Sequence, residues 1–263
     1  ELDRAWQRGV VARDEEDTLG PADFHTRFDY WAMFEGWKDV PENIRDCLNS
    51  WELQHYFSAH SQDLETIRSG RIPSPERFIP RYLLLKESLE VIDRVEHIYL
   101  WPCNCRLMLG NCSKPVHTCL RFFNDRDIGW EISPEKAKEV IQEANQAGLM
   151  QCGEFGLTKK GGLSGGICNC CADCCFPHLM AREFEAAKIW PRSRYLARQH
   201  QDLCLGCGRC VRRCPFQALT RDNTGKAKKG PPDFNPDLCR GCGLCATGCP
   251  EQAIEMVALP GAY

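Results

Sequence analysis

Eight cysteines near the C-terminal end of the chain occur in two copies of one pattern. The first copy has thiols at Cys204, Cys207, Cys210 and Cys214, and the second has thiols at Cys239, Cys242, Cys245 and Cys249. A proline follows the last cysteine of each copy. Repetition at a constant offset indicates an internal duplication.

Each copy reads C-x2-C-x2-C-x3-C-P, the spacing with which cysteine thiolates hold [4Fe-4S] clusters. In this arrangement three thiolates ligate one cluster, while the fourth cysteine ligates the other cluster. The spacing therefore predicts two clusters with crossed ligands. One takes Cys204, Cys207, Cys210 and Cys249, and the other takes Cys239, Cys242, Cys245 and Cys214.

The alternative for these eight cysteines is a pair of structural zinc sites. Zinc sites usually show two C-x2-C pairs set apart, whereas each copy here has three closely spaced thiols and ends in C-P. We therefore favour iron. On these motifs, the segment of about residues 193 to 258 resembles a bacterial dicluster ferredoxin.

Nine further cysteines form two upstream groups. They are Cys103, Cys105, Cys112 and Cys119, and then Cys168, Cys170, Cys171, Cys174 and Cys175. Two cubane clusters need eight thiolates, so we expect eight of the nine to hold two more [4Fe-4S] clusters. Adjacent side chains point in different directions. We therefore expect the segment 168–175 to lie between two clusters and to send thiols to each.

Three other arrangements of the upstream thiols remain open. They are one cluster with one zinc ion, a single cluster with an open iron at which a substrate binds, and a redox-active disulfide. Cys47 and Cys152 stand apart from the other thiols in the sequence, so we expect Cys47 to be a small buried residue and Cys152 to have a structural role. His117 and His178 lie near ligand cysteines and could donate protons, although such histidines more often hydrogen-bond to ligands.

The first part of the chain shows helical patterns. Aromatic residues between positions 24 and 37 recur at helical spacing, which predicts a packed core face. A second amphipathic segment begins near Asp39, and we expect Ile44, Leu48, Trp51 and Tyr56 to be its buried positions.

Further along, residues 85–95 carry an apolar helical stripe. Ser133 and Pro134 predict the start of a helix that Gly148 ends, with Ala147 as the last residue of its apolar stripe. Residues 153–166 are rich in glycine, and we expect a loop there.

We expect an α+β fold in three parts: a helical N-terminal region (1–79), a cysteine-rich iron–sulfur region (80–190) and a dicluster ferredoxin domain (191–263). In the last part, residues 195–198 predict a strand and residues 211–219 a helix.

The order of motifs resembles a family of multi-cluster iron–sulfur proteins from anaerobic bacteria and archaea. Pro102-Cys103-Asn104-Cys105-Arg106, Cys168-Asn169-Cys170-Cys171 and the terminal repeat match its layout over about residues 80 to 258. The resemblance implies the cofactors but no substrate. The family's N-terminal part is winged-helix-like, yet this chain has no basic recognition stretch, which favours a structural or partner-docking role.

Composition limits the possible classes of function. The formal net charge of −3 argues against a nucleic-acid binder. No apolar run approaches the ~18 residues of a membrane span. The chain has 19 cysteines, most of them clustered at metal-ligand spacings, which indicates a reducing compartment. We expect the cytoplasm of an anaerobic microbe.

Several clusters in one chain favour an electron-transfer protein or subunit over a stand-alone enzyme. The chain has no G-x-G-x-x-G nucleotide motif, so we expect a redox partner such as a flavoprotein or a larger reductase, with which it could form a hetero-oligomer. Lys226, Lys228 and Lys229 could dock an acidic partner. The alternatives are a reductase that acts on a substrate at an upstream cluster and, less favoured by the charge, a redox-sensing regulator.

Overall fold

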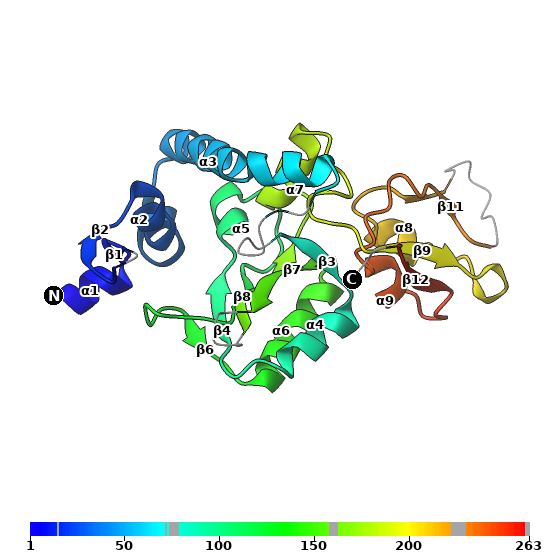
Figure 1. The fold of residues 1–263 in the computed structure, drawn as a ribbon. Coiled ribbons are helices and arrows are strands. Elements are labelled where there is room, and N and C mark those ends of the chain that lie inside the picture. Colours follow the sequence, from blue (N-terminus) through cyan, green and yellow to red (C-terminus); the bar gives the residue numbers. More distant parts are fainter. Residues whose placement is uncertain (15, 72, 74–78, 158–162, 222–229, 261–263) are drawn as a thin grey trace.

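The computed structural model describes residues 1–263 except 15, 72, 74–78, 158–162, 222–229 and 261–263. Lys226, Lys228 and Lys229 therefore lie outside the described residues. The first N-terminal elements lie at one end of the molecule, a six-stranded sheet lies in the middle with the helix of residues 42–68 extending over it, and a C-terminal unit lies at the other end (Figure 1). The mixture of helices and strands confirms the expected α+β class.

The N-terminal region is mainly helical. Its elements are α1 (Leu2–Gln7), β1 (Val11–Arg13), β2 (Leu19–Pro21), α2 (Phe24–Trp31), a π-helical turn (Ala32–Gly36), a 3-10 turn (Trp37–Asp39) and α3 (Glu42–Arg68). The buried side of α3 differs from the expectation. Phe57 and Leu64 pack against α7 (Phe176–Glu183), whereas Ile44 and Trp51 remain 47% and 37% exposed. This helix bridges two packing partners, so its apolar residues follow no single stripe.

The central sheet is antiparallel and has the strand order β3-β7-β8-β5-β4-β6. Its strands are β3 (Arg81–Leu83), β4 (Tyr99–Pro102), β5 (His117–Arg121), β6 (Trp130–Glu131), β7 (Met150–Leu157) and β8 (Leu163–Cys170). Helices α4 (Leu85–Ile92) and α6 (Pro134–Gln146) pack against one face of the sheet, where they share an apolar core with Leu120 of β5 and Ile167 of β8. The other face carries cysteines.

The glycine-rich passage is a hairpin and not the loop that we expected. Strands β7 and β8 pair without interruption from Met150 and Cys170 to Leu157 and Leu163. A Cβ atom on Gly165 would lie 2.0 Å from the carbonyl oxygen of Glu154. Glycine is therefore required here by the close approach of two strands.

Helix α6 has the expected termini. The Ser133 side chain accepts a hydrogen bond from the Lys136 amide at 3.2 Å, and Gly148 follows the helix with a φ of 78°. Ala137 and Ile141 on its stripe are buried in the sheet core, whereas Ala147 is exposed.

The C-terminal unit contains two small antiparallel sheets and two short helices. Strand β9 (Tyr195–Gln199) pairs with β12 (Ile254–Ala258), β10 (Leu219–Thr220) pairs with β11 (Asp233–Phe234), and the helices are α8 (Arg209–Arg213) and α9 (Leu244–Thr247). Helix α8 ends earlier than expected because Cys214 adopts an extended conformation before Pro215, and a residue that precedes proline disfavours the helical region.

Within the described residues, no helix is both long and apolar enough to cross a membrane. Helix α3 has 27 residues but is rich in polar side chains.

Candidate metal centres

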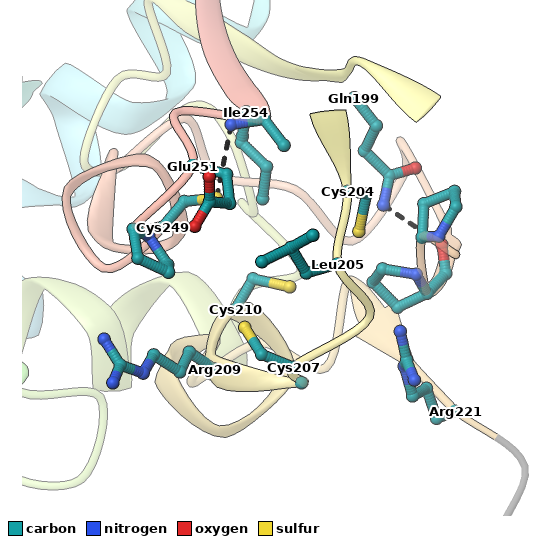
Figure 2. Close-up of a pocket in the computed structure, with 15 residues that line it drawn as sticks. Gln199, Cys204, Leu205, Cys207, Arg209, Cys210, Arg221, Cys249, Glu251 and Ile254 are labelled. Atoms are coloured by element: carbon teal, nitrogen blue, oxygen red, sulfur yellow. Dashed lines mark hydrogen bonds between the residues drawn. The ribbon is translucent and has the colours of Figure 1, made fainter. Parts of the chain in front are cut away.

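The repeated cysteines of the C-terminal unit surround two cavities. Cys204, Cys207, Cys210 and Cys249 line the first cavity (Figure 2), and Cys214, Cys239, Cys242 and Cys245 line the second. Glycines with positive φ precede α8 and α9, which lets each ligand loop turn into its helix. The structure thus gathers the same crossed sets of thiols that the spacing predicts.

Backbone amides in this unit are directed at the sulfur atoms. The Ala253 amide donates to Cys249 Sγ at 3.2 Å, and the amides of Leu244 and Ala246 donate to Cys242 and Cys245. Burial raises the pKa of Cys245 to about 12, so this thiol needs a bound cation to become a thiolate near neutral pH. Amide donors and buried thiols fit an anionic thiolate–iron core.

The face of the central sheet opposite α4 and α6 brings together cysteines from three strands. Cys152 on β7 and Cys168 on β8 are direct register partners, and Cys170 lies two residues further on the same face. Cys119 on β5 lies on the other side of Cys168, next to the pair formed by Leu120 and Ile167. Alternation along the strands thus separates a thiol face from the apolar face.

Six upstream thiols form a closed ring in which each contacts two neighbours. In order, the ring contains Cys103, Cys105, Cys175, Cys170, Cys168 and Cys119. Cys152 contacts Cys170 and so joins this group, although its sequence position suggested only a structural role. Its position opposite Cys168 follows from the β7–β8 pairing, which the glycine-rich sequence did not reveal.

The pKa is lowered and raised at alternate thiols of the ring, so negative charge is favoured at three of the six positions. Hydrogen bonds from Cys105 and Cys119 hold the pKa of Cys103 well below its usual value, and Arg106 adds to this effect. Arg106 is buried, and its guanidinium donates to the carbonyl oxygens of Pro115 at 2.6 Å and Asn169 at 2.5 Å. A fixed buried cation beside thiolates is suited to an anionic metal centre.

A carboxyl group also lies beside the ring. Burial and the nearby Cys168 raise the pKa of Glu154 to about 7, while Arg121 opposes the shift. A carboxyl group with this pKa can bind and release a proton near neutral pH.

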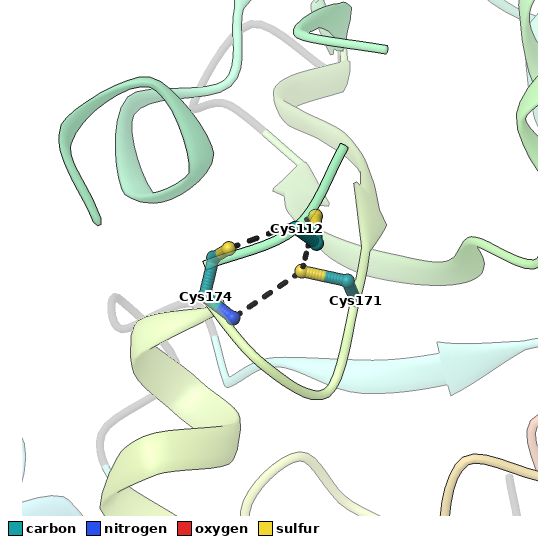
Figure 3. A group of neighbouring side chains, drawn as sticks. All are labelled: Cys112, Cys171 and Cys174. Carbon is teal, nitrogen blue, oxygen red and sulfur yellow. Dashed lines mark hydrogen bonds between the residues drawn. The ribbon is translucent and has the colours of Figure 1, made fainter. Parts of the chain in front are cut away.

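A second group of upstream thiols, which we call the trio, contains Cys112, Cys171 and Cys174 (Figure 3). The Sγ atom of Cys112 lies 3.6 Å from that of Cys171 and 3.7 Å from that of Cys174. Each adjacent pair is divided, because Cys170 and Cys175 face the ring whereas Cys171 and Cys174 face the trio. This is the division that opposite side-chain directions require.

Tyr82 joins the ring to the C-terminal unit. It packs in one apolar cluster with Cys152, Cys175 and Cys242. Its hydroxyl group lies 2.8 Å from His178 Nε2, and His178 Nδ1 lies 3.2 Å from the carbonyl oxygen of Cys171. A carbonyl oxygen only accepts, so Nδ1 carries the proton and Tyr82 donates to Nε2.

Two other residues singled out from the sequence lie away from the thiol groups. His117 is exposed and packs against Trp130, at 5.3 Å between ring centroids. Cys47 is exposed on α3, which corrects the expectation that it is a small buried residue.

Two crossed sets of four thiols around two cavities are the arrangement of a dicluster ferredoxin-type domain. Residues 203–253 match the sequence profile of the 4Fe-4S dicluster domain. The chain is also 54% identical over 28 residues to a ferredoxin from Pyrobaculum islandicum. That stretch is 11% of this chain and spans only 26% of the relative's length.

The chain thus contains a C-terminal dicluster ferredoxin-type domain for two [4Fe-4S] clusters, as the sequence predicted. A domain of this type transfers electrons and implies a redox partner.

Proposed function

We propose that the chain is an electron-transfer protein or subunit whose C-terminal clusters exchange electrons with an upstream iron–sulfur centre held by the ring. The observation that carries the proposal is the shared apolar cluster in which ring cysteines and the ferredoxin cysteine Cys242 pack around Tyr82. This packing supports direct electron exchange between the two groups, because both contact the same buried side chain.

The ring offers more thiols than one cubane cluster needs. Cys103, Cys119 and Cys168 interact with the buried cation Arg106 or the partly buried cation Arg121, and we propose them as ligands. When bound, the cluster supplies a one-electron carrier whose potential depends on burial and on hydrogen bonds to sulfur. The protein's own part is to bury the thiols, supply the cations and keep water out. Two further cubanes upstream, as expected from the sequence, would also require the trio.

We place the docking port for the partner at the first C-terminal cavity. Cys207 is exposed there, and Leu203 and Leu205 beside it are 52% and 70% exposed. Exposed apolar side chains next to a redox site suit a transient protein contact. A flavoprotein or a larger reductase is the class of partner that we propose, with this chain as one subunit of the complex. None of the 19 cysteines, which all lie among the described residues, is in a disulfide, which supports our proposal of a location in the reducing cytoplasm.

Anaerobic reduction kinetics test the proposal. We expect photoreduced protein to show, by rapid-freeze EPR, C-terminal signals first and an upstream signal after them. The variant Cys242→Ser, which disrupts the second C-terminal cluster, should slow the upstream signal. An upstream region without iron, or an upstream signal that forms equally fast in this variant, would contradict the proposal.

A second candidate function is a reductase, and a pocket of about 350 Å³ favours it. Tyr82 and His178 line this pocket together with Phe216 and Arg240 of the C-terminal unit. The pocket is therefore lined by residues from both sides of the contact between the central part and the C-terminal unit. Oxidation of the reduced protein by a small molecule without any partner, and its loss in His178→Ala, would support this function.

A further inference from the structure

The trio differs from every other thiol group of the described residues in its geometry. Its three Sγ atoms all lie within 4.8 Å of one another. The ferredoxin thiols instead line cavities, which leave room for an inorganic core. The trio therefore forms a much smaller site than a cubane cluster occupies.

The sulfur separations fit one tetrahedral ion. Zinc binds thiolate sulfur at about 2.3 Å, and two such ligands at a tetrahedral angle lie about 3.8 Å apart. The measured separations from Cys112 are 3.6 Å and 3.7 Å. Cys171 and Cys174 also form a C-x2-C pair, the spacing common in zinc sites.

The surroundings of the trio suit a site of low net charge. Three thiolates with a divalent cation carry one negative charge, and the guanidinium of Arg106 lies near Cys171. Leu109, Ala144 and Leu149 pack around the trio, while Cys112 is half-exposed. Within the described residues, no other histidine, cysteine or carboxylate belongs to the group.

We propose that Cys112, Cys171 and Cys174 bind a single zinc ion whose fourth position is filled by a ligand from solution. This ion has no redox role. It joins the segment that follows α5 (Asn104–Leu109) to the turn before α7. The electron-transfer proposal does not depend on it, because the trio is not in the path through Tyr82.

Metal analysis of anaerobically purified full-length protein tests the inference. We expect about one zinc per chain, and about 12 irons if the ring holds one cubane beside the two of the C-terminal domain. Zinc-edge X-ray absorption should show sulfur at about 2.3 Å. About 16 irons without zinc would overturn the inference and would fit a second upstream cluster.

Variants of Cys112 separate the outcomes. Cys112→Ala should lose most of the zinc while the iron content and EPR signals stay unchanged, and Cys112→His should retain zinc because imidazole also binds it. Cys47→Ser, which removes an exposed thiol that is not part of the trio, is the matched control and should match the parent protein. Loss of iron in Cys112→Ala, or a Cys171–Cys174 disulfide in the parent protein found by non-reducing peptide mapping, would overturn the zinc site. If the parent protein itself lacked the EPR signals of the C-terminal clusters, this would instead count against the electron-transfer proposal.

Discussion

Tyr82 combines two roles that substitution can separate. Its phenol side chain packs between Cys242 and the cysteines Cys170 and Cys175 of the thiol ring. Its hydroxyl group fixes the orientation of His178. The packing depends on the aromatic ring of Tyr82, whereas the hydrogen bond to His178 depends on its hydroxyl group alone.

Replacement of Tyr82 by phenylalanine should therefore leave electron transfer between the centres unchanged and cost about 1 kcal/mol of stability, the value of one hydrogen bond. Tyr82→Ala should cost about 3–5 kcal/mol through the cavity that it creates, and should slow the transfer. Anaerobic denaturant unfolding and rapid-freeze EPR measure the two effects. Equal electron-transfer rates in all three proteins would show that Tyr82 does not lie on the path.

Asp29 gives a pH-dependent prediction. Burial, and then the nearby Glu52, raise its pKa from 3.8 to about 6, so the folded protein favours the neutral carboxyl group. The stability that this group contributes is complete below pH 3.8 and is lost as pH rises through about 6. Asp29→Asn stays neutral, so relative to the parent protein it should gain about 1–2 kcal/mol between about pH 5 and pH 7.5. Unfolding curves of both proteins at the two pH values measure this gain. If the difference in free energy of unfolding between them were the same at both pH values, the raised pKa of Asp29 would be contradicted.

The hairpin β7–β8 is the element that builds the thiol face. It places Cys152, Cys168 and Cys170 on one surface, and its glycines allow β8 to approach both neighbouring strands. The ring therefore depends on close backbone contacts between strands as well as on the cysteines themselves.

Gly165→Ala should destabilise this element by roughly 2–4 kcal/mol, because φ is 99° and the new Cβ would lie 2.0 Å from the Glu154 carbonyl oxygen. The upstream centre should lose iron, while the C-terminal clusters remain. Gly20→Ala in β2 is the control, since a Cβ there meets no atom within 4 Å and should change stability by less than about 0.5 kcal/mol. Full retention of upstream iron in Gly165→Ala would contradict this account.

The same hairpin shows what the sequence could and could not predict. Crossed ligation in the C-terminal unit follows from local spacing, and the division of Cys170 from Cys171 follows from side-chain direction. Helix α6 was predictable because its cap, stripe and terminal glycine agree. The position of Cys152 opposite Cys168 was not predictable, because strand pairing depends on contacts between distant segments. Glycines in a strand also give the same sequence pattern as a loop.

On the scale of the whole molecule, Arg213 docks the C-terminal unit on the central part. Its guanidinium donates to the carbonyl oxygens of Asn145 at 2.8 Å and Gln146 at 3.1 Å, at the end of α6. It also donates to Leu244 within its own unit at 2.8 Å. A cation at a helix C-terminus satisfies free carbonyl groups and interacts favourably with the helix dipole.

Arg213→Met should weaken this docking by about 2 kcal/mol, because charge-assisted hydrogen bonds are lost. Electron transfer between the ring centre and the C-terminal clusters should slow, with the cluster potentials little changed. Arg212→Met on the same helix removes an exposed cation and serves as the control. Identical transfer rates in Arg213→Met and Arg212→Met would contradict the docking role.

The thiols also differ in their access to solvent along the molecule. Cys207 is exposed at the outer end, whereas Cys103, Cys119, Cys170 and Cys175 are buried. Dissolved oxygen should therefore damage the outer cluster first, because it reaches that sulfur most easily. Brief exposure to air would then disconnect the protein from its partner while the inner centre survives, and repair would need to replace only the outermost iron.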